Sequence, residues 1–366
     1  MKVCLIGNNL TSLILAHILS KKNISSEIYY TKSQKNIFRT RTLGITENNV
    51  RYLNKYFKEI SKKINPINEI EVLVENEKIS EEIKFQKNST TLFNMVNYNK
   101  LVTYINRKIR KNKNIKIKIK NNRFNLSNLL DNKEFDLIIN CERSNILTKK
   151  YLKIKINKNY YNKAFTTIIK HKSIKNNKAK QIFTKYGPLA FLPLSRTETS
   201  IVFSLEENKI NKVSNDIIFD FVKKFNTTYK IKSHENFENF HLYFRLPKNY
   251  FYKNILFFGD SIHTIHPLAG QGFNMTIRDI TKLIEILERR QKLGLGIDKN
   301  VFNEFQQGSK NYNTIFSFGV DFIYEFFKFN NNYLPAKISK KIFSKFNQNN
   351  MLKKLSIKLA NSGISY

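Results

Sequence analysis

The segment from Ile255 to Asp279 constrains the fold of this chain more than any other part of the sequence. An apolar run over 255–258 ends in Gly259-Asp260, and a proline-containing loop and a Gly-Gln-Gly turn follow. Apolar residues then recur at helical spacing, at Ile277, Ile280, Leu283, Ile284 and Leu287. This order predicts a strand that presents Asp260 at its carboxyl end, where ligands bind in open α/β sheets. The glycines allow close approach to the backbone, and the helix start offers free N–H groups to negative charge. The segment therefore predicts a site for a polar cofactor.

The same segment resembles the second FAD motif of the group A flavoprotein aromatic hydroxylases. The matching pattern is Gly-Asp-x-x-His-x-x-x-Pro-x-x-Gly-Gln-Gly, which begins at Gly259. The string from His266 to Asn274 is similar to the ubiquinone-biosynthesis hydroxylases of the UbiH, UbiF and Coq type. This resemblance implies an FAD-dependent monooxygenase that hydroxylates the aromatic ring of a polyprenylated phenol. NAD(P)H would reduce the FAD, and O2 would then give the flavin C4a-hydroperoxide that attacks the ring.

The resemblance also implies roles for individual residues. Asp260 would hold the ribitol of FAD, and the residues lining the isoalloxazine would be Pro267, Gly270, Gln271, Gly272, Phe273 and Asn274, with Gly259 in the turn. N–H groups at the helix start would face the N1–C2=O edge of the ring, where negative charge develops. His263 and His266 are candidates for acid–base chemistry near neutral pH. The alternative is that both histidines are structural parts of the loop.

The amino-terminal segment predicts a βαβ unit. Val3–Ile6 reads as a buried strand, a helix follows over 13–19, and a second strand lies around 28–30. The expected G-x-G-x-x-G fingerprint is replaced by Gly7, Asn9 and Ser12, and the acidic residue after the second strand is missing. We interpret these three residues as part of the FAD site. An ordinary βαβ unit is the alternative.

Two further segments resemble cofactor-binding parts of the same family. Arg41 matches the arginine of the family's Arg-x-x-Ala-Leu-Ser segment, which lies near the FAD phosphates or ribose. The family's Gly-Ala-Asp-Gly is replaced here by Asn140-Cys-Glu142-Arg143. Glu142 would replace the acidic residue, whereas Arg143 replaces a glycine and opposes close backbone approach. This departure bears on NAD(P)H binding more than on FAD binding.

Residues 164–205 alternate in the manner of sheet strands. The stretch 186–194 resembles the family's Gly-Pro-Leu-Ala-Leu-Leu-Pro segment, whose sheet covers the isoalloxazine and walls the substrate pocket. We therefore expect the pocket to be lined by Leu189, Phe191, Pro193 and Leu268. Ordinary core strands are the alternative for each of these positions.

The resemblance implies an α/β fold of the FAD/NAD(P)-binding Rossmann-like, p-hydroxybenzoate hydroxylase type with an inserted, mostly antiparallel β-sheet. The FAD-binding domain would comprise residues 1–70, 95–160 and 245–330, and the sheet domain residues 71–94 and 161–244. A basic, amphipathic helical tail would occupy 331–366. Apolar stripes are expected there over 338–346 and 352–359, after an earlier stripe at Phe316, Val320, Ile323 and Phe327.

The charge and the cysteines indicate which kinds of partner the protein binds. The net charge is +36, but the lysines are spread along the chain and no nucleic-acid motif accompanies them. Basic amphipathic helices in the tail suit a membrane surface, and packing on the protein or on a second subunit is the alternative. Cys4 and Cys141 lie in apolar runs and read as core residues, and no metal-ligand spacing occurs. No signal peptide and no apolar run of spanning length stand out, so we expect a cytoplasmic protein peripherally bound to the inner membrane.

Two other functions stay open. The eroded nucleotide motifs fit a non-catalytic member of a quinone-biosynthesis assembly, in contact with other proteins of that pathway. A flavoenzyme of the same fold that acts on an isoprenoid is the second alternative.

Overall fold

The first strand lies inside a six-stranded sheet, as its continuous apolar sequence predicts. The computed structural model describes residues 1–31, 39–75, 79–86, 91–120, 126–130, 134–207, 214–267 and 270–333. The sheet has the order β16-β17-β9-β1-β2-β8, and only β16 runs antiparallel to its neighbour. Its strands are β1 (Lys2–Ile6), β2 (Ser25–Thr31), β8 (Ile115–Lys120), β9 (Leu137–Asn140), β16 (Phe251–Tyr252) and β17 (Ile255–Phe257). The chain leaves β1 toward β2 on one side and returns to β9 on the other, which makes the carboxyl end of β1 a topological switch point.

Helices cover this sheet and share its core. They include α1 (Leu10–Lys21), α3 (Tyr98–Ile109), the short α4 (Ile146–Tyr151) and α7 (Gln271–Lys292). The apolar stripe predicted on α7 is buried along its whole length. Residues 115–119 alternate strictly and form part of β8, but the alternation does not bury a face, since Ile117 and Ile119 are exposed at the sheet edge. Cys4 and Cys141 are buried and unpaired with each other, as expected of core residues.

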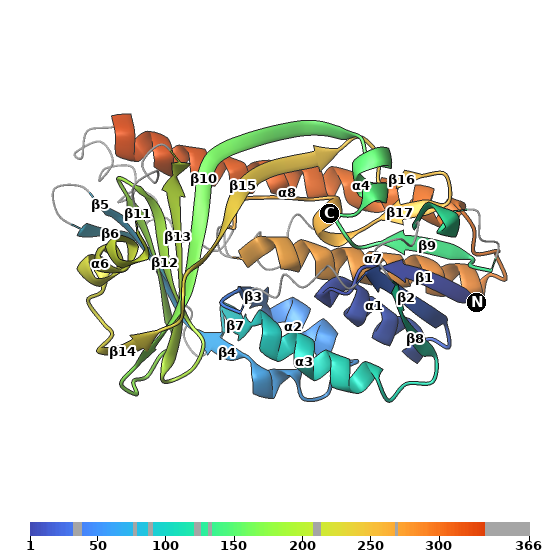
Figure 1. Cartoon of the computed structure of the whole chain (residues 1–366), viewed down its shortest axis with the longest axis horizontal. Coiled ribbons are helices and arrows are strands. Elements are labelled where there is room, and N and C mark those ends of the chain that lie inside the picture. Colours follow the sequence, from blue (N-terminus) through green and yellow to red (C-terminus); the bar gives the residue numbers. More distant parts are fainter. Residues whose placement is uncertain are drawn as a thin grey trace.

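An eight-stranded, mostly antiparallel sheet stands beside the first (Figure 1). Its strands are β5 (Glu69–Glu75), β6 (Ile79–Gln86), β10 (Ile154–His171), β11 (Lys178–Thr184), β12 (Gly187–Pro193), β13 (Glu198–Glu206), β14 (Ile231–His234) and β15 (Glu238–Pro247). Helix α6 (Asn215–Phe225) buries Ile218, Val222 and Phe225 against one face of this sheet. Strand β10 is long and curved, and with β15 it arches from this sheet toward the six-stranded one (Figure 1).

A three-stranded sheet lies between the two larger ones. It consists of β3 (Thr42–Thr46), β7 (Phe93–Asn97) and β4 (Asn65–Ile67), and α2 (Glu47–Asn54) follows β3. Residues 66–72 alternate in the manner of a single strand, but they do not form one. The chain breaks at Asn68, whose N–H donates to the carbonyl of Asn177, so β4 and β5 join different sheets. Single-turn 3₁₀ helices lie at Ile60–Lys63, Leu126–Leu129 and Gly259–Ser261.

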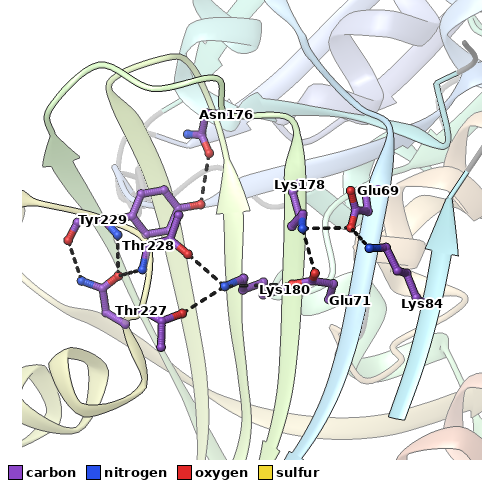
Figure 2. A network of polar contacts seen from close by, with 10 residues as sticks. Glu69, Glu71, Lys84, Asn176, Lys178, Lys180, Thr227, Thr228 and Tyr229 are labelled. Carbon is purple, nitrogen blue, oxygen red and sulfur yellow. Dashed lines mark hydrogen bonds and ion pairs between the residues drawn. The ribbon is translucent and has the colours of Figure 1, made fainter. Parts of the chain in front are cut away.

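The parallel pair β5–β11 carries a row of ion pairs (Figure 2). Lys178 Nζ lies 2.9 Å from Glu69 Oε1 and 2.8 Å from Glu71 Oε1, and Lys84 reaches Glu69 at 2.9 Å. Lys180 donates to the hydroxyl of Thr228 at 2.9 Å. Opposite charges facing each other across strands favour this register over a slipped one.

The last described helix, α8 (Asn300–Tyr333), runs past both large sheets (Figure 1). Its stripe differs from the prediction. Val320 and Phe327 are buried as expected, but the buried face continues through Tyr324, and Ile323 is 49% exposed. Phe327 stacks on Phe183 of β11 with ring centres 3.8 Å apart. None of the helices in the described part of the chain is long and apolar enough to cross a membrane.

Candidate active site

The loops after β1, β9 and β17 meet at the carboxyl edge of the six-stranded sheet. Gly7 has φ +110°, and a Cβ there would lie 2.9 Å from the Cβ of Glu142 in the loop after β9. Gly259 has φ +63°, and a Cβ there would approach Thr11 at 3.1 Å. Both contacts and both backbone angles require glycine. The loops therefore pack tightly at the switch point, where Asp260 follows Gly259.

The start of α7 is open. Gly270 precedes the helix with φ +63°, and a Cβ there would lie 2.8 Å from the backbone N of Gly44 in β3. No side chain caps this end of the helix. A Cβ on Gly272, in the first turn, would meet no heavy atom of the described residues within 4 Å. The uncapped N–H groups and the positive end of the helix dipole thus lie at a turn where no described side chain approaches Gly272.

Asn274 holds α7 to β3. Its Oδ1 accepts from the N–H of Thr46 and from Asn49 Nδ2, each at 2.9 Å, and its Nδ2 donates to the carbonyl of Gly44 at 2.9 Å. Both polar atoms of this buried side chain are satisfied by the protein. The sequence predicts that Asn274 contacts FAD, but its side chain has no polar atom left for that contact, and its carbonyl accepts from Asn49.

The two histidines of the loop differ in their surroundings. His263 Nε2 lies 2.8 Å from Asp279 of α7, whose other carboxylate oxygen accepts from Asn313 of α8. His266 is 1% exposed, and neither of its ring nitrogens has a hydrogen-bond partner among the described residues. Burial lowers the pKa of His266 to about 3, with a further contribution from the positive charge of Lys158. The ring is therefore neutral near pH 7, which contradicts a role as a charged general acid.

His266 and Pro267 border a small cavity against the eight-stranded sheet. The cavity measures about 30 Å³, and its other lining residues are Gln181, Pro188, Ala190, Leu192, Val202 and Ser204. The ring of His266 stacks on Tyr324 and meets the edge of Tyr160, which fixes its orientation beside the cavity.

The expected pocket residues Leu189 and Phe191 do not line this cavity. Both side chains pack with α6 on the opposite face of β12, because neighbours in a strand point to opposite faces. Pro193 shares their alternate positions, and its carbonyl accepts from Asn65. The prediction was therefore one residue out of phase: Ala190 and Leu192 face the loop. Leu268 lies outside the described residues.

In the loop between β1 and α1, the predicted nucleotide-binding loop, protein groups already occupy the polar atoms. Asn9 Oδ1 accepts from the N–H of Ser12 at 3.1 Å, and its Nδ2 donates to the carbonyl of Cys141 at 2.7 Å. The N–H of Leu10 donates to the hydroxyl of Tyr98 at 3.3 Å. No local sequence pattern predicts this role of Tyr98. Two of the N–H groups that a diphosphate would use are thus occupied.

Arg41 stands beside this loop. Its Nη2 lies 3.4 Å from Asp260 Oδ2, and its guanidinium carbon lies 4.8 Å from the ring centre of Tyr98. Both charged side chains are partly exposed, so the pair contributes little stability. The structure therefore brings the loop of Gly7 and Asn9 together with Arg41 and Asp260, which are distant from it in sequence.

Two halves of the site differ in how they fit FAD. The open start of α7, the free space at Gly272 and the buried, unpartnered Oε1 of Gln271 fit a ring with polar edges. The start of α1 fits a diphosphate less well, because Asn9 and Tyr98 occupy its N–H groups. The ring-binding half is the better formed of the two.

Comparisons with known proteins agree with this geometry. The family model described as squalene epoxidase matches residues 149–365, more than half of the chain. The 3-demethoxyubiquinol 3-hydroxylase of Escherichia coli (strain K12) is 30% identical over 167 residues, covering 44% of this chain and 42% of that protein. The mitochondrial ubiquinone biosynthesis monooxygenase COQ6 of Danio rerio is 26% identical over 195 residues, covering 42% of this chain and 40% of that protein. The matches thus span less than half the length of these relatives.

Solved structures share the fold over nearly the whole chain. The p-nitrophenol 4-monooxygenase PnpA from Pseudomonas putida DLL-E4 gives a TM-score of 0.77 at 12% identity, covering 99% of this chain and 98% of that chain. PqsL, a probable FAD-dependent monooxygenase from Pseudomonas aeruginosa, gives 0.70 at 12% identity, covering 94% and 99%. These likenesses establish the expected α/β fold.

Proposed function

Because the chain belongs to the squalene epoxidase family, we propose that it is an FAD-dependent monooxygenase that hydroxylates the aromatic ring of a polyprenylated phenol in ubiquinone biosynthesis. NAD(P)H would be the electron donor and O2 the co-substrate. The similarity to ubiquinone-pathway hydroxylases supports the phenol as substrate. Discrete FAD and substrate domains, with the boundaries expected from the sequence, belong to the same proposal, although β10 runs continuously through the boundary expected at residue 160.

The observation that carries the proposal is the uncapped start of α7 beside the cavity at His266. FAD supplies the oxygen-activating chemistry when bound. Asp260 would hold its ribitol, and the backbone of Gly270 to Asn274 would line the ring. The N–H groups of the first turn of α7 stabilise negative charge beside them, because a helix start is positive. The apolar face of β12 and β13 excludes water from this side.

A second candidate is the epoxidation of an isoprenoid double bond. Its support is the family model itself, which spans most of the eight-stranded sheet and all of the 255–279 segment. The cavity lining is mostly apolar and fits either an alkene or a ring. We prefer the phenol because the string from His266 to Asn274 resembles the ubiquinone branch.

The absorption spectrum of the purified protein tests cofactor binding first. Bound FAD gives bands near ~370 and ~450 nm. A colourless protein that FAD does not reconstitute would overturn the enzyme reading and favour a non-catalytic member of a quinone-biosynthesis assembly. Turnover is then measured with NAD(P)H, ¹⁸O₂ and either a short-chain prenylated phenol or squalene. Mass spectrometry shows which product carries one labelled oxygen, and labelled epoxide alone would favour the second candidate.

We also propose that the protein binds the surface of an anionic inner membrane from the cytoplasmic side. Ile315, Phe318 and Phe322 form a stripe on α8, and they are 48%, 45% and 69% exposed. A net charge of +36 favours an anionic surface. The basic tail expected to assist lies outside the described residues. A long prenyl chain would enter the protein most readily from a membrane surface.

A further inference from the structure

The start of α1 departs from the usual way of holding a dinucleotide. Backbone N–H groups at a helix start normally bind the diphosphate. Here the N–H of Ser12 donates to Asn9 Oδ1 at 3.1 Å, and that of Leu10 to the hydroxyl of Tyr98 at 3.3 Å. Neutral side-chain oxygens therefore take the place that an anion would occupy.

The loop after β9 is also satisfied within itself. Asn140 and Asn145 donate to each other at 2.8 and 3.2 Å, and Thr148 donates to the carbonyl of Glu142 at 2.7 Å. The carboxylate of Glu142 accepts from Ser144. This network ties the loop to the start of α4. It leaves Arg143 as the member of the loop whose side chain no hydrogen bond in the described structure holds.

Arginine side chains lie near the start of α1, where the backbone N–H groups are already occupied. Arg41 lies 3.4 Å from Asp260, as described above. Arg143 lies within electrostatic reach of Arg245 and Asp260, and it is half-buried. Burial lowers the pKa of Arg143, the positive charge of Arg245 lowers it further, and Asp260 opposes both. Three guanidinium groups thus share this region with the carboxylates of Asp260 and Glu142, which leaves an excess of positive charge.

Arg245 is held in place from β15. Its Nε donates to Asn157 at 2.9 Å, and its guanidinium carbon lies 4.1 Å from the ring centre of Tyr243. Its backbone forms a bridge with Thr264, whose hydroxyl donates to the carbonyl of Asp260 at 3.3 Å. The arginine is therefore attached to the same loop that presents Asp260.

We propose that Arg143 and Arg245, together with Arg41, bind the diphosphate of the dinucleotide in place of the N–H groups of α1. The inference rests on the proposed function, because FAD is the dinucleotide concerned. Guanidinium groups bind phosphate oxygens in pairs, and the bond is strengthened by charge and by burial. The excess positive charge around Asp260 then finds its counterion in the diphosphate. The arginine that replaces a family glycine thereby becomes a ligand-binding residue.

Binding of three probes to the full chain tests this cluster. FAD, riboflavin and ADP are titrated by calorimetry into the wild type, Arg143→Ala, Arg245→Ala and the control Arg110→Ala, which removes an exposed arginine at the end of α3. Each cluster variant should bind FAD and ADP about tenfold more weakly or worse, since each loses a charge-assisted contact. Riboflavin has no diphosphate, so its affinity should not change. Arg143→Lys should recover part of the loss, and its melting temperature controls for folding.

The outcomes separate the cluster from the proposed function. FAD and ADP affinities that are unchanged in both alanine variants would overturn the cluster, while FAD binding itself would leave the flavin function standing. ADP binding that depends on Arg143, in a chain that takes up no FAD, would support the cluster and end the flavin function. Equal losses of FAD and riboflavin affinity would mean that the arginines support the fold, and the inference would then be wrong.

Discussion

Asn274, in the first turn of α7, accepts a hydrogen bond from the backbone N–H of Thr46 at 2.9 Å. This bond and one to the carbonyl of Gly44 attach the glycine turn to β3, and a third, from Asn49, attaches it to α2. Asn274, which resembles a cofactor ligand in the sequence, thus has a structural role: its side chain holds the glycine turn in position. Replacing it separates a structural effect from a binding effect.

Asn274→Ala should lower the free energy of unfolding by about 1–3 kcal/mol, because the Thr46 N–H and the Gly44 carbonyl lose their partner inside the protein. Urea denaturation measures the change. Asn303→Ala, on an exposed position of α8, serves as the control and should cost less than about 0.5 kcal/mol. A variant as stable as the wild type would contradict the role assigned to this side chain.

Gly272→Ala tests where the flavin ring lies. The added methyl group meets no described atom within 4 Å, so stability should change by no more than about 1 kcal/mol. Flavin affinity should nevertheless fall, because the methyl group would occupy the space assigned to the ring. Calorimetry with riboflavin measures this loss. Normal riboflavin binding by the folded variant would show that the flavin ring does not lie at the start of α7.

Gly270→Ala is the matched comparison. It adds the same methyl group at φ +63° and 2.8 Å from a backbone nitrogen of Gly44. We expect a loss of stability of about 1–3 kcal/mol together with the loss of flavin binding. Gly272→Ala and Gly270→Ala should therefore differ in urea denaturation and agree in flavin titration.

Glu238 predicts a pH dependence. Burial acts to raise the pKa of Glu238, but hydrogen bonds from Thr40 and Arg39 outweigh it and hold the pKa below its usual range. A lowered pKa stabilises the folded state above the unfolded pKa, and this stabilisation is lost as pH falls through the folded value. Glu238→Gln should therefore cost about 1 kcal/mol at pH 7, discounted for partial exposure.

The difference between Glu238→Gln and the wild type should shrink as pH falls from about 5 to below 4. Urea denaturation at several pH values measures it. Glu235→Gln, three residues earlier in the chain, provides a control and should show no such trend. A difference that stays constant down to the lowest pH would mean that the charge of Glu238 is not what stabilises the contact.

The exposed stripe on α8 predicts membrane binding. Phe318→Ser with Phe322→Ser should weaken flotation with vesicles that contain phosphatidylglycerol, because large apolar surface no longer enters the lipid. Leu293→Ser with Leu295→Ser removes similarly exposed residues after α7 and should leave flotation unchanged. Equal flotation of both double variants would exclude the stripe as the binding surface.

Local sequence patterns predicted the elements of the site well. The apolar run, the glycines and the helical spacing over 255–279 gave β17, the loop and α7. These signals are short-range, because turn chemistry and periodicity are properties of a few neighbouring residues. Gly7 and Gly259, both in motifs identified from the sequence, lie at positive φ.

The sequence does not show which distant segment packs against each face of an element. Alternation in β12 predicts two faces, but only the position of α6 shows that Leu189 and Phe191 belong to the face away from the loop. Arg143 looks in the sequence like a lost glycine, whereas in the structure Arg245 of β15 lies within its electrostatic reach. Asn274 reads as a ligand until β3 is seen to use both of its polar atoms. Each of these contacts joins segments that are distant in the chain.

The long, curved strand β10 couples the stability of the eight-stranded sheet to that of the six-stranded sheet. Its ladder with β15 begins at Ile154 opposite Pro247 and continues, with a shift in register, to Thr166 opposite Glu238. A single ribbon of hydrogen bonds thus reaches from the nucleotide side of the molecule to the wall of the cavity. Neither sheet can rotate as a rigid body without breaking hydrogen bonds between β10 and β15. Heat should therefore melt both in one cooperative step, and ligand entry must depend on smaller movements of loops and side chains.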